Sequence, residues 1–283
     1  MEKRLNFRKL FVFALIMFAV LAVPGTPLWA EEEEKPTGDF TTAFLNQYVW
    51  RGYESSRNSV VIQPSMTIGY KGFSVNLWGN MDTAPYSPEG KSYTGTWNET
   101  DLTLSYTKTL GLFNVGGGYI YYSLASLNKD AADRNDVQEL FATVSLNTIL
   151  SPTLTVYKEI DHYRNWYFLF GISHVLELHK AVSLKLAASA SYLLSTDADT
   201  YPKYDSNAVA TTDKFTNFHD GSVSASLPIK VTDRITVTPT LSYIFPLSGE
   251  AKDEMKGLGL KGGTASERDS SFVVGGILAS FSF

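Results

Sequence analysis

The side chains with the greatest catalytic potential in this chain are its histidines. They are His162, His174, His179 and His219. A serine nucleophile needs a histidine at hydrogen-bond distance that a third polar group orients. His162 is expected at a loop mouth beside Asp161, and Ser173 precedes His174 on a strand, where neighbouring residues point to opposite faces. We therefore expect no enzyme; a lipase that uses Ser, His and Asn is the less favoured alternative.

Glycines and aspartates offer two further kinds of chemistry. The spacing Gly257-x-Gly259-x-x-Gly262 matches a dinucleotide motif, but no strand precedes it and no helix follows it, so we expect a loop. Asp197, Asp199, Asp205 and Asp213 could hold a divalent cation, although a solvated acidic loop is the simpler interpretation. The chain has no Cys, which excludes thiol and zinc-cluster chemistry. We expect no cofactor and no metal.

The elements that position these residues follow a period of two. Residues 60–70 alternate apolar with small or polar side chains, and after Lys71-Gly72 the alternation resumes over residues 73–82, as in a hairpin with a two-residue turn. No convincing helical period is present from Asp39 to Phe283. About twelve such segments occur, starting near residues 40, 59, 73, 97, 112, 137, 153, 166, 182, 218, 235 and 270.

The connections alternate between short turns and long polar loops. An even number of antiparallel strands with short turns at one end and long loops at the other is typical of an outer-membrane barrel. The fold predicted is all-β: a transmembrane antiparallel up-and-down β-barrel of about 12 strands. A mean hydropathy of -0.08 excludes a bundle of spanning helices, whereas a barrel averages an apolar outside with a wet inside.

The barrel fold also predicts where its aromatic, proline and glycine residues should lie. Two interfacial girdles are predicted: Tyr70, Phe73, Tyr106 and Phe113 near the turns, and Tyr119, Tyr121, Tyr122, Trp166, Tyr192, Tyr243 and Phe245 toward the loops. Pro64 and Pro239 should lie at bulges or strand ends, because proline donates no ladder hydrogen bond. The glycines 116–118 should mark a bend or a close approach of neighbouring strands.

The polar face should line the lumen and carry the function. The lumen-lining candidates are Arg51, Asp82, Glu99, Asp101, Glu139, Glu159, Asp161 and Lys185. A mostly acidic lining with low-dielectric walls would favour cations over anions. The alternative is that Arg51 and these acids form a buried salt-bridge network that plugs a narrow interior.

The two ends of the chain carry targeting features. A basic segment and the apolar run Leu10–Val23 predict a secretory signal peptide over 1–30, cleaved near Ala30, then a periplasmic tail over 31–38 and the barrel over 39–283. Residues 1–30 carry a net +3, so the exported chain carries -8 instead of -5. The last strand has Ile277, Ala279, Phe281 and Phe283 on one face, and this pattern resembles the signal that the barrel-assembly machinery recognises.

A family resemblance covers residues 40 to 125. The segment 44–52 ends in Tyr48-x-Trp50-Arg51-Gly52, and Gly72-Phe73, Trp78-Gly79-Asn80, Glu99-x-Asp101 and Gly118 with Tyr121-Tyr122 follow it in order. Together these motifs resemble the TorF family of outer-membrane porins. Tyr53-Glu54-Ser55 departs from the family's Ser-x-Ser after Arg-Gly. The resemblance implies an exported outer-membrane barrel and implies no particular solute.

Two functions remain open for such a barrel. The first is a porin-like channel in the outer membrane for passive diffusion of small polar solutes or ions, with lipid and the assembly machinery as partners and no nucleic acid. The second is a non-conducting structural or surface-interaction barrel. An open, charge-lined bore favours the channel, and a bore closed by ion pairs favours the second function.

Overall fold

The computed structural model describes residues 35–86, 95–126, 136–260 and 268–283. The barrel belongs to the compact unit Pro36–Phe283. The predicted signal peptide over 1–30 and residues 31–34 of the predicted tail lie outside the described residues, and so does Gly262 of the glycine motif.

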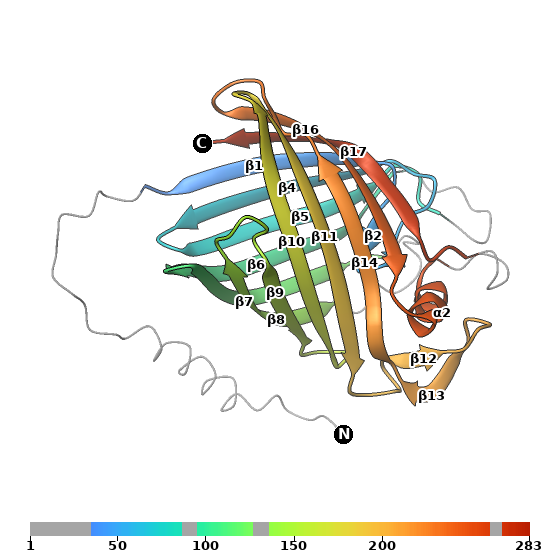
Figure 1. Cartoon of the computed structure of the whole chain (residues 1–283). Coiled ribbons are helices and arrows are strands. Elements are labelled where there is room, and N and C mark those ends of the chain that lie inside the picture. The colour runs from blue at the N-terminus through green and yellow to red at the C-terminus, as the bar shows by residue number, and fades with distance from the viewer. Residues whose placement is uncertain (1–34, 87–94, 127–135, 261–267) are drawn as a thin grey trace. The chain divides into compact units, whose positions relative to one another are not determined.

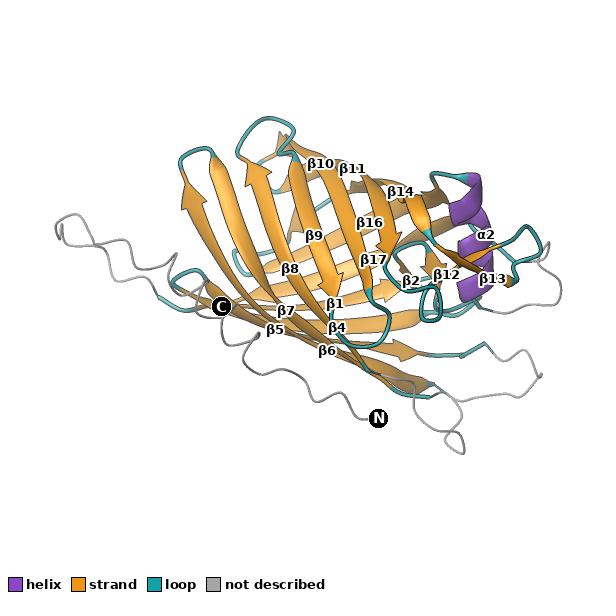
Figure 2. Cartoon of the chain, turned by 90° about the horizontal axis from the view of Figure 1, so that it is seen from below, coloured by secondary structure: helices purple, strands orange, loops and turns teal. Residues whose placement is uncertain are grey.

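Twelve long antiparallel strands form one closed sheet (Figures 1 and 2). They are β1 (Thr37–Leu45), β4 (Val61–Tyr70), β5 (Phe73–Asp82), β6 (Thr96–Leu110), β7 (Phe113–Leu124), β8 (Val137–Leu146), β9 (Thr153–Glu159), β10 (Asn165–His179), β11 (Val182–Ser195), β14 (Thr216–Ser226), β16 (Ile235–Pro246) and β17 (Phe272–Ser282). Sequential neighbours pair, β1 pairs with β17, and the two-residue β15 (Ile229–Lys230) bridges β11 and β16. The predicted fold class is confirmed.

Short elements gather at the loop end of the barrel (Figure 1). They are the hairpin of β2 (Val49–Trp50) and β3 (Tyr53–Glu54), the hairpin of β12 (Pro202–Tyr204) and β13 (Ala210–Lys214), and helix α2 (Gly249–Leu258). The expectation that residues 39–283 contain no helix is therefore wrong at α2, which occupies part of an expected loop.

No helix within the described ranges has the length and hydropathy needed to cross a bilayer.

The turn between β4 and β5 shows why the short connections are tight. Lys71 and Gly72 have φ angles of 51° and 82°. Two consecutive residues with positive φ are typical of a type I′ turn, whose twist matches that of a hairpin. The predicted two-residue turn at Lys71-Gly72 is confirmed.

The outer face of the barrel is apolar, as the alternation predicts. Phe73, Val75 and Leu77 alternate along β5 with relative exposures of 60%, 47% and 54%, and Leu241 and Tyr243 of β16 are likewise exposed. One predicted girdle residue is wrong. Tyr122 is buried in the bore and donates to Glu139 at 2.9 Å, because it has the opposite strand parity from Tyr121.

The two prolines of the strands lie where strand pairing is interrupted, and a glycine lies where two strands approach closely. Pro64 pairs with Thr42 of β1 but falls in a gap of the ladder to β5, and Pro239 faces the interval between β14 and β15. Gly118 permits a close approach of strands, since a Cβ there would lie 2.2 Å from the carbonyl oxygen of Leu104. The expectation for the glycines is confirmed.

Candidate functional site

The β2–β3 hairpin turns into the bore at Arg51-Gly52. Both residues have positive φ, 49° and 80°, which again favours a two-residue hairpin turn. Gly52 also lies against α2, because a Cβ at Gly52 would be 2.4 Å from the Cε of Met255. A larger residue at position 52 would therefore be strained and would also collide with the helix.

The guanidinium group of Arg51, at the hairpin tip, contacts one carboxylate and three aromatic rings. Its guanidinium donates to both carboxylate oxygens of Glu139 on β8, each at 2.7 Å. The guanidinium carbon also lies 4.5 Å, 4.6 Å and 4.3 Å from the ring centroids of Trp50, Tyr157 and Tyr167. Burial lowers the pKa of Arg51, but the Glu139 carboxylate more than offsets this effect, and the net pKa is raised. The arrangement is a fixed, fully charged bidentate pair in an aromatic cage.

A β-bulge in β14 supplies the second part of the site. Ala190 of β11 pairs with Gly221 and Tyr192 pairs with Phe218, so His219 and Asp220 together oppose the single residue Ser191. Such a bulge re-aims side chains, and here both His219 and Asp220 are buried inside while Phe218 stays exposed outside.

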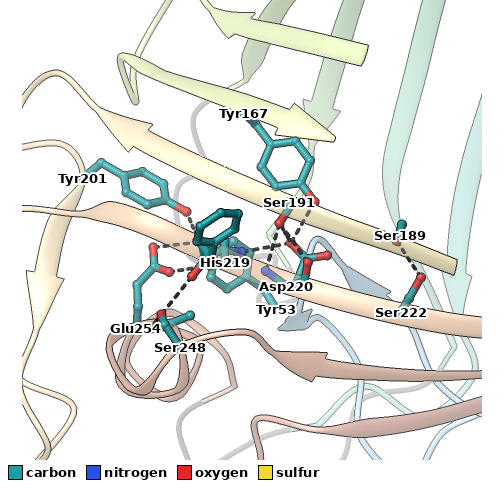
Figure 3. A network of polar contacts seen from close by, with 12 residues as sticks. Tyr53, Tyr167, Ser189, Ser191, Tyr201, His219, Asp220, Ser222, Ser248 and Glu254 are labelled. Carbon is teal, nitrogen blue, oxygen red and sulfur yellow. Dashed lines mark hydrogen bonds and ion pairs between the residues drawn. The ribbon is translucent and has the colours of Figure 1, made fainter. Parts of the chain in front are cut away.

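The two bulge residues anchor a buried network (Figure 3). His219 Nδ1 lies 3.0 Å from Asp220 Oδ1, and His219 Nε2 lies 2.5 Å from Glu254 Oε2 of α2. Tyr53 of the hairpin donates to Glu254 Oε1 at 2.8 Å and contacts the hydroxyl of Tyr201. Burial first, and the Glu254 carboxylate second, raise the pKa of Tyr53, so its phenol keeps its proton and can donate.

Asp220 ties this network to the barrel wall. It accepts hydrogen bonds from Tyr167 of β10 at 2.7 Å and from Ser191 of β11 at 2.6 Å. The aromatic and aliphatic core of the described chain surrounds the network: Tyr53, Tyr167, Leu193, Tyr201, Phe215, Ala251 and Met255. We call the β2–β3 hairpin and α2, held in this way, the loop-end plug.

The geometry does not match serine-nucleophile chemistry. Ser191 donates to Asp220, whereas both ring nitrogens of His219 face carboxylates. A base must hydrogen-bond the hydroxyl that it activates. The remaining histidines lie apart: His162 pairs with Asp161 at 3.3 Å in a loop, and His174 bonds the carbonyl of Ile149 at the outside of β10.

Helix α2, which the alternation of side chains does not predict, has capping residues that can be recognised in the sequence. Ser248 caps the helix by accepting from the Ala251 backbone N–H, and Glu250 lies in the first turn. Ala251, Glu254 and Met255 are buried at helical spacing. The buried residues of α2 span too few turns to show a helical period in the sequence. The capping residues are therefore the feature that predicts this helix.

Four of the predicted lumen acids lie near the loop end of the barrel. Two of them are on β6, and the other two accept hydrogen bonds that hold loops. Glu99 hydrogen-bonds Tyr48, and Asp101 is half-buried on the same inner face. Asp82 accepts from Ser59 and from the Ala84 backbone at 3.1 Å. Glu159 accepts three backbone N–H groups, those of residues 161, 162 and 164.

The remaining predicted residues lie outside the plug. Asp161 lies in the loop after β9 and accepts from Gln138, while Lys185 is exposed on the inner parity of β11. Three of the predicted insertion-signal residues lie on β17, which pairs with β1 and β16, and the fourth follows this strand directly. The four are Ile277, Ala279, Phe281 and Phe283, and the last closes the barrel through backbone bonds with Gly38.

Two aspartates of the predicted acidic loop form hydrogen bonds or ion pairs with neighbouring groups. Asp197 pairs with Arg164 at 3.0 Å, and Asp205 accepts from the backbone of Asn207 and Val209. Among the described residues there is no group of three or more side chains placed to hold a metal ion.

A cavity of about 310 Å³ lies directly beneath the plug. Its lining combines the hairpin tip with the inner faces of β7, β9, β10, β11, β14 and β16. The polar groups around it are already paired: Arg51 with Glu139, Ser189 with Ser222 at 2.7 Å, and Asp220 with the wall residues of β10 and β11.

The closed sheet, with its apolar outer belt and polar bore, defines a membrane-spanning β-barrel. No family model and no curated protein matches the chain. Solved barrels are similar in fold: the NanC porin (12% identity, 86% of this chain and 98% of that chain, TM-score 0.49), the translocator domain of autotransporter NalP from Neisseria meningitidis (11%, 98% and 96%, 0.40) and the Salmonella typhi OmpF complex with daunomycin (6%, 88% and 97%, 0.38).

Proposed function

We propose that the chain is an outer-membrane, porin-like channel for small polar solutes and ions, closed at its loop end by the plug in the conformation described. The observation that carries the proposal is the contrast between the two halves of the bore. The loop half holds the plug, while the turn half is lined by half-buried hydroxyl and amide side chains. The TorF-like motif Trp50-Arg51-Gly52 forms the tip of the plug, which gives this resemblance a structural role.

The lining of the turn half supports passage of water and polar solutes. Asn76 donates to Ser65 and Thr67 at 2.8 Å each, and Thr143 contacts Thr155 at 3.0 Å. These groups bridge neighbouring strands and stay partly exposed. These pairs satisfy only part of the hydrogen-bonding capacity of the hydroxyl and amide groups, and water must satisfy the rest, so the lining fits a wet lumen better than a dry core.

Diffusion of many small solutes fits the cavity better than tight binding of one ligand. A specific pocket presents a few polar groups that await a ligand. Here the polar lining groups bind one another, as with Arg51 and Glu139. We therefore infer weak contacts with many small solutes.

We further propose a modest preference for cations in the open state. The acidic side chains Glu99 and Asp101 lie on the inner face of the β6 wall beside the plug, where Glu139 pairs with Arg51, and Glu159 and Asp82 accept hydrogen bonds that hold loops. Glu99→Gln/Asp101→Asn should bring the permeability ratio of K⁺ to Cl⁻ close to that of free diffusion. An unchanged permeability ratio would show that Glu99 and Asp101 do not determine the ion selectivity.

A non-conducting barrel is the second candidate, and the closed bore favours it. Ion pairs that fill an interior can serve shape alone. The two candidates differ in their conductance once the plug has left the bore: a channel conducts, whereas a structural barrel does not.

Planar-bilayer recording of the refolded chain tests the proposal. The parent should be mostly closed, and Glu254→Gln, which removes the carboxylate that faces His219, should conduct steadily. Plug release is checked separately by labelling a Leu193→Cys thiol, since Leu193 is 2% exposed beneath the plug and the chain has no other Cys. A variant whose thiol labels freely but which carries no current would establish the structural barrel instead.

A further inference from the structure

The outer surface at the turn end combines aromatic and basic side chains. Tyr70, Phe73 and Phe113 are exposed there by 45%, 60% and 49%. Lys71 lies over the Tyr70 ring, 5.3 Å from its centroid, and Lys108 is exposed on the outer parity of β6. Long basic side chains above an aromatic girdle are placed where a bilayer has its headgroups.

The turns themselves expose aliphatic side chains to an unusual degree. Leu112, Ile149 and Val231 lie in three different turns, and Leu178 lies at the turn end of β10; the exposures of Leu112, Ile149, Leu178 and Val231 are 63%, 75%, 58% and 60%. Hydrogen bonds fix the turn that carries Ile149, including Asn147 N–H to Leu112 O at 2.8 Å. Ordered apolar tips at the end of a membrane protein favour an environment that is partly apolar.

Charge differs between the two ends of the barrel. The turns carry Lys71, Lys180, Lys230 and Arg234 against Glu177 and Asp233. The described loops at the other end carry more acids than bases, among them Asp197, Asp199, Asp205 and Asp213. A basic surface next to a bilayer attracts anionic lipid.

We propose that the turn end is a binding collar for anionic phospholipid headgroups. Lys71, Lys108, Lys180 and Arg234 are its cations, and they bind the phosphate-bearing headgroups of one leaflet. The tips Leu112, Ile149, Leu178 and Val231 enter the boundary between headgroups and acyl chains. The collar does not depend on whether the bore conducts.

Lipid selectivity of the refolded full chain tests the collar. Vesicles of phosphatidylcholine receive trace spin-labelled phosphatidylglycerol or spin-labelled phosphatidylcholine, and electron paramagnetic resonance measures the fraction immobilised by protein. One cation near a surface favours an anionic lipid about fivefold, so we expect roughly twofold enrichment of phosphatidylglycerol averaged over the lipid shell. High salt should abolish the enrichment.

A matched pair of variants locates the effect. Replacing the four collar cations by Gln should remove the enrichment. Replacing Arg164, Lys214, Lys252 and Lys256 by Gln removes the same charge at the loop end and should leave the enrichment unchanged. No enrichment in the parent, or enrichment that survives loss of the collar cations, would overturn the proposal.

A second measurement needs no change of charge. An environment-sensitive fluorophore on Ile149→Cys, which is a unique thiol in this Cys-free chain, should be quenched by brominated lipid and shielded from iodide. The same label at Val209→Cys is the control, because Val209 is 58% exposed in the loop-end β12–β13 hairpin and should report water. Iodide quenching at position 149 equal to that at position 209 would place the tips in water, where a protein partner could dock, and would contradict the lipid collar.

Discussion

Replacing Arg51 by Met should release the loop-end plug. The substitution keeps much of the side-chain volume but leaves the Glu139 carboxylate, whose side chain is 1% exposed, with the Tyr122 hydroxyl and without a positive charge. Breaking a buried ion pair from one side costs about 3–5 kcal/mol, because the remaining charge is buried and uncompensated. Loss of the three ring contacts adds to this cost.

The closed state of the plug should therefore become roughly 10²- to 10⁴-fold less favoured relative to the open state. The reporter is a Leu193→Cys background common to all variants, labelled with a membrane-impermeant thiol reagent. When opening and closing are fast, the labelling rate follows the population of the open state. Arg51→Met should raise that rate by the stated factor, up to the rate of a permanently exposed thiol such as Val209→Cys, since Val209 is 58% exposed.

Two further variants determine whether the pair is the cause. Arg51→Met/Glu139→Gln removes the stranded charge and should return most of the protection, leaving the smaller cost of the lost ring contacts. Lys203→Met breaks a partly exposed pair with Glu250, and such pairs are weak because water screens them, so its rate should change less than about tenfold. An Arg51→Met rate equal to that of the parent, or a double variant that labels faster than the single one, would refute the reasoning.

Three other outcomes are expected from contacts of the plug and the wall. Glu254→Gln should raise thiol labelling at position 193 by roughly 10²-fold or more, since it also breaks a buried ion pair; protection equal to the parent would contradict this. Gly118→Ala should lower the folded yield on heat-modifiability gels, because its Cβ meets a carbonyl oxygen at 2.2 Å, whereas Gly171→Ala, with 3.8 Å to its nearest atom, should fold normally. Hydrogen bonds from Lys203 and Asn217 lower the pKa of Glu250, so the contribution of this carboxylate to docking of α2 is fully present above its ordinary value of 4.5 and is lost as the pH falls through the lower folded value. A spin label on α2 should become more mobile across that acidic range, and Lys203→Gln should shift the change toward higher pH; an unshifted transition would refute the assignment.

Much of the barrel could be predicted from the sequence because its physical cause repeats at every second residue. Lipid contact demands apolar side chains on one parity, so strands such as β5 and β16 are visible without tertiary information. The girdle prediction is wrong at Tyr122 because strand parity, and not aromatic character, decides which face a side chain occupies. The network at His219 could not be predicted, since alternation assumes that one residue opposes one residue, and the bulge opposite Ser191 breaks that assumption.

The bulge also explains how the loop-end plug is held in the bore. With regular pairing, only one of His219 and Asp220 could face the bore, and the Glu254 carboxylate would have no buried cation within the network. The extra residue brings a histidine and a carboxylate to the same side, so α2 is held by charge and hydrogen bonds in addition to the aliphatic contacts of Met255. Polar attachment of this kind is strong when every partner is present and weak when one is missing. A plug fixed in this way is therefore sensitive to the loss of single side chains, whereas the barrel wall is held by backbone hydrogen bonds along every strand pair.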